Sequence, residues 1–234
     1  MNVDRAAYAD AICAAAKRSA LSLSDSVKTD VLSFVDYMLD VNRELNLTRI
    51  VLPEDVAVKH FEDSWTLLPL LPDGCSLLDI GTGAGFPGFA VKLVRPDIRL
   101  TVIESIGKKV RFLTDAAAHV GFDADIRLGR AELLAHDSDL RGQFDVVTAR
   151  AVASLDMLLE MSLPFVRTGG QFIAMRGQEE AVPTFIGKLG AELTKTLRLT
   201  LTGDVTRTLY VFTKVSATPK HLPRSLGAMR KRPL

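Results

Sequence analysis

A cluster of glycines near position 80 is the feature of this chain that most clearly indicates a binding site. Residues 77–80 have the apolar character of a buried strand, and Gly81, Gly83 and Gly85 follow it, ahead of a segment compatible with a helix. Because glycine has no side chain, a strand that runs into such a loop brings bare main chain up to a ligand. The pattern predicts a nucleoside or phosphate bound at the carboxyl edge of a sheet.

The spacing of these glycines distinguishes between two classes of cofactor. A dinucleotide site requires Gly-x-Gly-x-x-Gly, but Phe86 occupies the position of its third glycine. Asp79 and the three glycines instead satisfy Asp-x-Gly-x-Gly-x-Gly, which resembles motif I of the S-adenosylmethionine (AdoMet) methyltransferases. An AdoMet site is therefore our interpretation, with a ligand-free glycine turn and an NAD-linked dehydrogenase as alternatives.

Three further positions are expected to complete this site. Glu104 ends the second predicted strand, 23 positions after Gly81, where a carboxylate commonly accepts hydrogen bonds from ribose hydroxyls. The loop 129–132 follows the third strand, which in AdoMet methyltransferases places it beside adenine. Arg150 follows the fourth strand, where related enzymes keep the residues that handle their substrate. The corresponding structural interpretations are a solvated acid, a polar turn and a structural salt bridge.

The positions around Arg150 also limit the chemistry. The chain has no Asn/Asp-Pro-Pro-aromatic motif of the kind used by adenine amino-group methyltransferases. Pyrimidine-C5 methyltransferases need a cysteine nucleophile, but Cys13 falls in the N-terminal helices and Cys75 at the wrong end of the first strand. Both of these nucleic-acid reactions are therefore disfavoured.

Alternating strand and helix signals indicate how these loops are positioned. The order predicts an α/β fold with a Rossmann-like, seven-stranded, mostly parallel sheet, preceded by helices and closed by an antiparallel hairpin. We expect three parts: a helical extension over 1–72, a methyltransferase domain over 73–217 and a basic tail over 218–234. Strands are expected at 76–81, 99–104, 124–128, 144–149, 171–176, 192–201 and 207–215. Helices are expected at 4–20, 25–42, 53–70, 86–95, 107–120, 154–163 and 179–189.

Composition agrees with an ordinary globular protein. The 234 residues are 47% hydrophobic and 24% charged, and no apolar run is long enough to span a membrane. The N-terminus lacks the apolar core of a signal peptide, and the two cysteines suggest neither a metal site nor a disulfide framework. These features favour a cytoplasmic protein without a metal ion or a membrane partner. We also expect a monomer.

Several motifs, taken together, make the resemblance more specific. Asn46-Leu47-Thr48, His60, the 79–88 segment, 105–113, Arg150-Ala151 and the ending 218–234 occur in an order that resembles the ribosomal RNA small subunit methyltransferase G family, also called glucose-inhibited division protein B. The resemblance runs nearly end to end. It implies methylation of N7 of a guanine in a 16S rRNA loop near the decoding site, with S-adenosylhomocysteine as the other product. It also implies AdoMet contacts at Gly81, Phe86, Ala131, Glu132 and Arg150.

This reaction would need no general base, because guanine N7 carries a lone pair and no proton. Catalysis should then depend on orientation and on exclusion of water. We expect Arg130, Arg150 and His60 to position the substrate. Rival interpretations are a methyltransferase for a small molecule or protein, and a non-catalytic AdoMet-binding ribosome-assembly factor. Binding to 16S rRNA in the small ribosomal subunit is assigned to the following cations: Lys108, Lys109, Arg111, Lys220, Arg224, Lys231 and Arg232.

Overall fold

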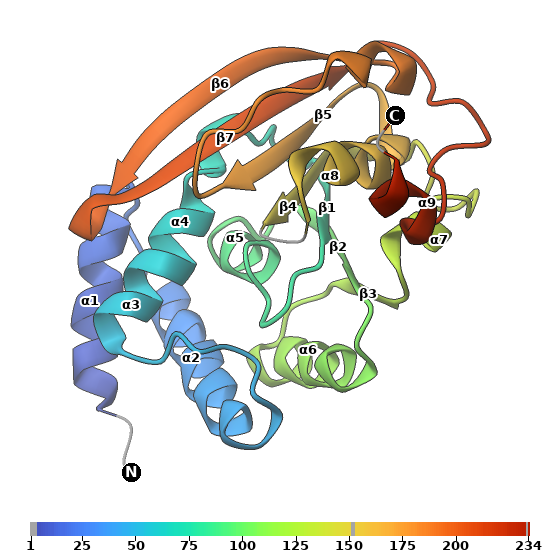
Figure 1. The fold of residues 1–234 in the computed structure, drawn as a ribbon. Coiled ribbons are helices and arrows are strands. Elements are labelled where there is room, and N and C mark those ends of the chain that lie inside the picture. The colour runs from blue at the N-terminus through green and yellow to red at the C-terminus, as the bar shows by residue number, and fades with distance from the viewer. Residues whose placement is uncertain (1–3, 151–152, 233) are drawn as a thin grey trace.

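The computed structural model describes residues 4–150, 153–232 and 234. Its centre is a seven-stranded sheet with the strand order β3-β2-β1-β4-β5-β7-β6. Neighbouring strands are parallel except at β7, which is antiparallel to both β5 and β6. This arrangement confirms the predicted fold class, and Figure 1 shows the long β6–β7 hairpin along one edge of the sheet. The strands are β1 (Ser76–Ile80), β2 (Arg99–Glu104), β3 (Asp125–Leu128), β4 (Phe144–Arg150), β5 (Val166–Arg176), β6 (Ala191–Leu201) and β7 (Val205–Lys214).

Helices precede the sheet, as the sequence predicts. The Ser24 side chain accepts a hydrogen bond from the backbone N–H of Val27 and so caps the second helix. The expected single helix over 53–70 is wrong, because the segment is divided into α, π and 3-10 turns. The elements are α1 (Arg5–Arg18), α2 (Asp25–Leu45), α3 (Pro53–Val56), the π-helix η1 (Ala57–Glu62), α4 (Asp63–Trp65) and the 3-10 helix η2 (Leu68–Leu70).

The helices that follow the strands also differ in part from expectation. The helix expected at 179–189 is reduced to a 3-10 turn beginning after Pro183, whose ring disfavours helical backbone in the residue before it. The segment taken as a tail contains a helix. The elements are α5 (Gly88–Val94), α6 (Gly107–Val120), α7 (Ala131–Leu134), α8 (Leu155–Ser162), α9 (Leu226–Lys231) and the 3-10 turns η3 (Leu163–Phe165), η4 (Thr184–Leu189) and η5 (Thr202–Asp204).

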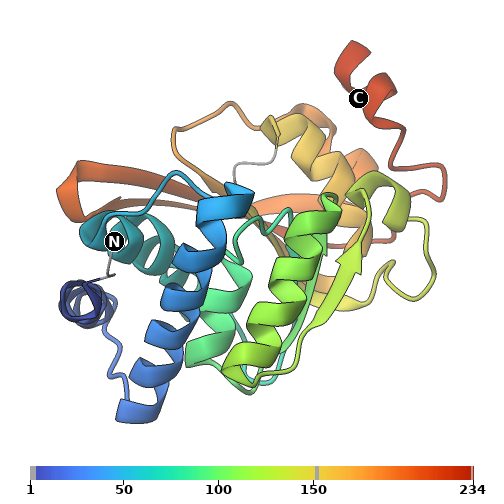
Figure 2. The same cartoon turned by 90° about the horizontal axis from the view of Figure 1, so that it is seen from below.

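The two faces of the sheet have separate hydrophobic cores. On one face, side chains of α1 and α2 share a core with α5, α6 and the sheet, and Phe34 and Phe89 are fully buried within it. On the other face, α8, η4 and α9 pack on the sheet, with Leu158 and Met229 buried. Figure 2 shows α2, α5 and α6 side by side on one side of the sheet and α8 and α9 on the other. The division at 72 and 217 remains a prediction.

Candidate active site

The glycine loop connects β1 to α5 at the carboxyl edge of the sheet. Gly81, Gly83 and Gly85 all have positive φ angles, of 71°, 61° and 96°, a region that residues with a side chain rarely adopt. A Cβ on Gly85 would also lie 3.1 Å from ring atoms of Phe34 and Phe89. The loop therefore needs glycine both for its backbone conformation and for its packing against the N-terminal helices.

Asp79, the next-to-last residue of β1, connects this loop to α5. Its side chain is fully buried, and one carboxylate oxygen accepts a hydrogen bond of 2.8 Å from the backbone N–H of Gly88 at the start of α5. Burial raises the pKa of Asp79 to about 6. The carboxylate thus fixes the loop to the start of α5, and the contact predicted between Asp79 and the cofactor remains a prediction.

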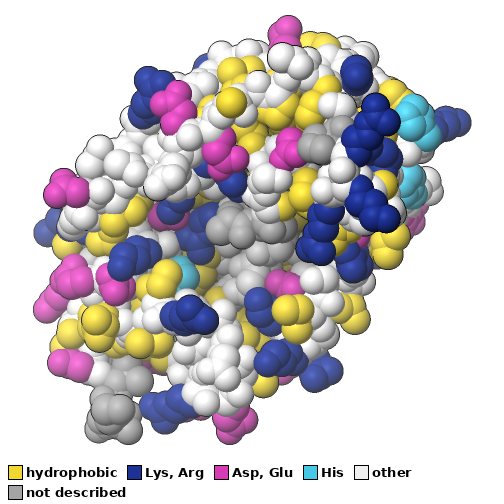
Figure 3. Space-filling model, in the orientation of Figure 1, with side chains coloured by type: hydrophobic (Ala, Val, Ile, Leu, Met, Phe, Trp, Pro, Cys, Tyr) yellow, Lys and Arg dark blue, Asp and Glu magenta, His cyan; other side chains and the backbone are white. Residues whose placement is uncertain are grey.

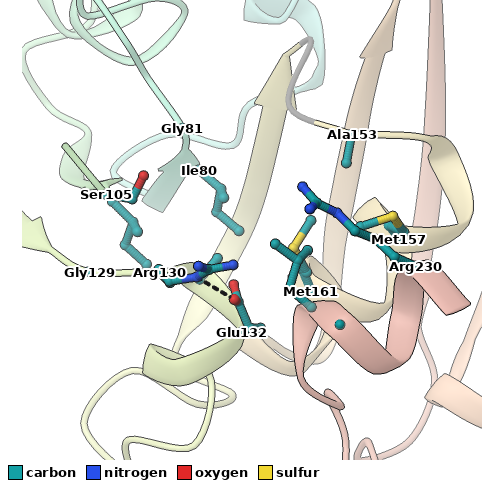
Figure 4. Close-up of a pocket in the computed structure, with 14 residues that line it drawn as sticks. Ile80, Gly81, Ser105, Gly129, Arg130, Glu132, Ala153, Met157, Met161 and Arg230 are labelled. Atoms are coloured by element: carbon teal, nitrogen blue, oxygen red, sulfur yellow. Dashed lines mark hydrogen bonds and ion pairs between the residues drawn. The ribbon is translucent and has the colours of Figure 1, made fainter.

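Beside this loop lies a cavity of about 630 Å³, within the range of small-molecule sites. It lies at the ends of β1 and β2, is open on one side, and is bordered by the 129–132 loop, α8 and α9 (Figure 4). Of the predicted site residues, Gly81, Arg130, Ala131 and Glu132 line it. Gly129 of the predicted 129–132 loop also lines it. The remaining lining residues were not predicted from the sequence; they are Ile80, Ile103, Ser105, Ala153, Met157, Met161, Leu226, Gly227 and Arg230.

Glu104 joins the first two loops of this site. It is 5% exposed; its Oε1 accepts from the N–H groups of Ser105 and Ile106, at 2.8 and 3.0 Å, and its Oε2 accepts from Gly83 N–H at 3.2 Å. Ser105 Oγ is a third donor to Oε1, at 3.5 Å, whereas Oε2 accepts only from Gly83, so the second lone pair of Oε2 remains for a ribose hydroxyl. The glycine loop, this carboxylate and the apolar cavity wall fit the nucleoside part of AdoMet.

The third loop, which begins at Gly129, leads directly into α7. Arg130 Nε donates to Glu132 Oε1 at 2.6 Å, so the charges of these two predicted site residues compensate each other (Figure 4). A Cβ on Gly129 would lie 2.8 Å from the side chain of Leu134. The absence of that Cβ lets α7 fold back over the loop and brings Ala131 to the cavity.

His60 lies away from the cavity in the π-helix η1. Its ring stacks on Phe86 with 4.1 Å between centroids and an interplanar angle of 4°. Nδ1 lies 3.3 Å from Arg150 Nη2, which only donates, so Nε2 carries the proton and faces Thr48 Oγ1 at 3.1 Å. Burial, then the charge of Arg150, lowers the pKa of His60 to about 3. His60 thus holds Phe86 and Arg150 with both ring nitrogens engaged, and its predicted role in positioning the substrate remains a prediction.

Arg150 faces the N-terminal helices rather than the cavity. Its Nη1 donates to the Lys59 carbonyl at 2.7 Å and to the fully buried Asp63 carboxylate at 2.9 Å. Arg207 of β7 donates to the same carboxylate at 2.6 and 2.7 Å. The guanidinium also lies over the Phe86 ring, 5.8 Å from its centroid. These hydrogen bonds of Nη1 and Nη2 connect β4 to the N-terminal helices, and the AdoMet contact predicted for Arg150 remains a prediction.

The predicted RNA-binding cations occupy different surroundings. Lys108 donates to the Leu45 carbonyl at 3.1 Å, and Arg224 binds Glu160, so the structure gives both a partner within the chain. The side chains of Arg111, Lys220, Lys231 and Arg232 are exposed, and that of Lys109 is half-buried. On the face drawn in Figure 3, Lys and Arg side chains gather over α7 and α9.

Neither a membrane-spanning helix nor a metal-binding cluster is found in the part of the chain that the structure describes. In residues 4–150, 153–232 and 234, no helix is long and apolar enough to cross a membrane. The same ranges contain no group of three or more His, Cys, Asp or Glu side chains that could hold a metal ion. Ala151, part of the motif after β4, lies outside the described residues.

The strand order, the antiparallel β7 and a glycine-loop site at the end of β1 define a class I AdoMet-dependent methyltransferase. The fold is similar to that of the antibiotic-resistance methyltransferase Kmr, with a TM-score of 0.51, 18% identity and coverage of 67% of this chain and 94% of that one. It is also similar to MtNAS, solved in complex with MTA and tNA, with a TM-score of 0.51, 15% identity and coverage of 92% and 72%.

The sequence comparisons identify the family. The profile described as rRNA small subunit methyltransferase G matches residues 28–184. A ribosomal RNA small subunit methyltransferase G from Pelotomaculum thermopropionicum is 44% identical, over 86% of this chain and 88% of the relative. One from Lactobacillus delbrueckii subsp. bulgaricus is 40% identical, over 84% and 87%. The chain belongs to the rRNA small subunit methyltransferase G family, which confirms the predicted family and enzyme class, with AdoMet as cofactor.

Proposed function

We propose that this enzyme transfers the methyl group of AdoMet to N7 of a guanine in a 16S rRNA loop near the decoding site. The observation that carries the proposal is family membership over most of the chain, together with a cavity at the glycine loop whose walls suit a nucleoside. A cytoplasmic monomer that acts on the small ribosomal subunit is part of the same proposal.

The chemistry agrees with the side chains of the site. When bound, AdoMet supplies an electrophilic methyl group on a sulfonium sulfur. Guanine N7 offers a lone pair without a proton, so the protein needs to orient the two groups and exclude water rather than move a proton. Among the described residues, the only carboxylate that lines the cavity is Glu132, and Arg130 is bound to it. The imidazole of His60 is neutral and turned away.

Recognition of RNA would depend on phosphate contacts from cations around the cavity. The exposed side chains of Lys231 and Arg232 at the end of α9 are next to Arg230, which lines the cavity. We include Lys109, Arg111 and Lys220 in this surface. Lys108 and Arg224 are retained only as secondary contacts, since each already has a partner in the chain.

The test is transfer of label from radioactive AdoMet to small-subunit RNA or particles, taken from cells that lack a family member. Digestion to nucleosides should place the label in 7-methylguanosine at a single position. Gly81→Val is the matched negative control, since it alters the loop without removing a charge. Label in another base, or in a protein or small molecule of the extract, would refute the assignment; binding of AdoMet without any transfer would favour an assembly factor.

A further inference from the structure

The C-terminal segment, residues 218–231, is fastened to the body of the protein by Arg141. Its guanidinium donates to the carbonyl oxygens of Leu222, Thr218 and Pro219 at 2.9, 3.0 and 3.0 Å, and to Ala135 at 2.7 Å. Because the Arg141 side chain binds three carbonyl oxygens of the segment, it fixes the path of the segment's backbone.

A second anchor joins the segment to α8. Glu160 is 2% exposed, and its carboxylate accepts from the backbone N–H of Arg224 at 2.8 Å and from its Nε and Nη2 at 2.9 and 2.7 Å. Met229 of α9 is 1% exposed within the core beneath. The segment is therefore part of the fold, attached to α8 through Arg224 and packed on the core through Met229.

This position makes α9 a wall of the cofactor cavity. Leu226, Gly227 and Arg230 all line it. Figure 4 shows the Arg230 side chain extending into the cavity from the α9 side, across from Ser105 and Arg130. The predicted ribose and adenine contacts are on the Ser105 and Arg130 side. Arg230 thus faces the part of the cavity that the cofactor loops leave for the second substrate.

The charges in the cavity wall are not balanced. Arg130 is compensated by Glu132. The side chain of Arg230, in contrast, has no hydrogen bond or ion pair to any residue that the structure describes. An uncompensated guanidinium at the edge of a cavity is suited to a phosphate, which it can bind through two parallel hydrogen bonds.

We propose that Arg230 binds a phosphate next to the guanosine being methylated, and that residues 218–231, held by Arg141 and Glu160, place it there. The inference rests on the proposed function and adds a substrate-positioning residue to it. The C-terminal segment is then part of the active site and not only a basic tail.

The experiment compares Arg230→Gln with Arg230→Lys and with Lys188→Gln. Lys188 is an exposed lysine of η4 that does not line the cavity, so its replacement removes the same charge elsewhere. For Arg230→Gln we expect KM for the RNA to rise about tenfold and the slope of log K against log salt to fall by about 1. The Kd for AdoMet, measured by calorimetry without RNA, should stay at the wild-type value. Arg230→Lys should recover part of the loss, because it retains the charge but not the fork of donors.

The outcomes separate the possibilities. A Kd for AdoMet that rises with the RNA KM would place Arg230 on the cofactor and overturn the inference. Equal effects of Arg230→Gln and Lys188→Gln would mean that Arg230 contributes only to the overall positive charge of the protein. This result would also overturn the inference. A wild-type enzyme that transfers no methyl group to small-subunit RNA would refute the proposed function itself, before any variant is compared.

Discussion

Asp63 allows a direct test of how the helices hold the end of β4. The side chain has no exposed surface and accepts hydrogen bonds from two arginines, one from Arg150 at 2.9 Å and two from Arg207 at 2.6 and 2.7 Å. Asparagine at this position has almost the same shape, but it carries no charge and points an N–H₂ group at one of the guanidinium groups. Asp63→Asn therefore leaves two largely buried cations without their counter-ion.

The magnitude follows from the burial of the group. Removal of one partner from a buried ion pair costs about 3–5 kcal/mol, and Asp63 serves two arginines, with side chains that are only 16% and 15% exposed. We therefore expect Asp63→Asn to lower the free energy of unfolding by about 4 kcal/mol. For a chain of this length that corresponds to a fall in melting temperature of roughly 10 °C.

Asp55→Asn is the matched control. Asp55 pairs with Lys59 at 2.7 Å, one helical turn away, but the two side chains are 38% and 42% exposed, and such pairs contribute about 0.3–0.5 kcal/mol. Urea unfolding of wild type and both variants at pH 7 measures the difference. If Asp63→Asn loses no more stability than Asp55→Asn, the buried carboxylate does not hold β4 and β7 to the helices.

Three further outcomes are expected. Gly81→Val should weaken AdoMet binding at least tenfold in calorimetry, because the φ angle of 71° strains a β-branched residue in the cofactor loop; unchanged affinity would contradict the site. The unfolded chain binds a proton at His60 near pH 6.5, whereas the folded pKa is lowered to about 3, so this histidine makes stability fall as the pH drops through that window, by up to about 1.4 kcal/mol per pH unit. His60→Gln should lack this contribution, and parallel stability curves from pH 7 to pH 4 would argue against a buried neutral imidazole. Finally, kcat at saturating AdoMet and RNA should be flat between about pH 6 and 9, since no residue transfers a proton, whereas a bell-shaped profile would indicate a general acid or base.

The strands and the glycine loop could be predicted because their causes are local. Apolar runs of strand length end at turn residues, and the positive φ angles at Gly81 and Gly85 require the residue type that the sequence shows. The helix α9 was not predicted, because its basic residues indicated a charged tail rather than a helix. Its N-cap Ser225, with Leu226 and Met229 three positions apart, was the available signal for a short helix packed on a core.

The contacts that determine what His60 and Arg150 do could not be predicted in the same way. Arg150 was correctly placed at the end of β4, but its partner Asp63 lies 87 residues away along the chain, and Arg207 lies 144 residues from Asp63. A sequence shows that a cation and a carboxylate exist, and only the packing of η1 against β4 and β7 shows that they meet. The structure shows both side chains making hydrogen bonds within the protein, and the roles predicted for them toward ligands remain predictions.

Those same contacts explain how the site can act without acid–base catalysis. Three nearby groups that could exchange a proton already have a structural use: Asp79 fixes the loop, Glu132 binds Arg130 and His60 supports Phe86. The methyl transfer that we propose requires fixed distances between two bound molecules, and fixed loops provide them. Ionisable residues that lock the loops in place therefore contribute to the rate through geometry, while the uncompensated charge of Arg230 is left for the RNA.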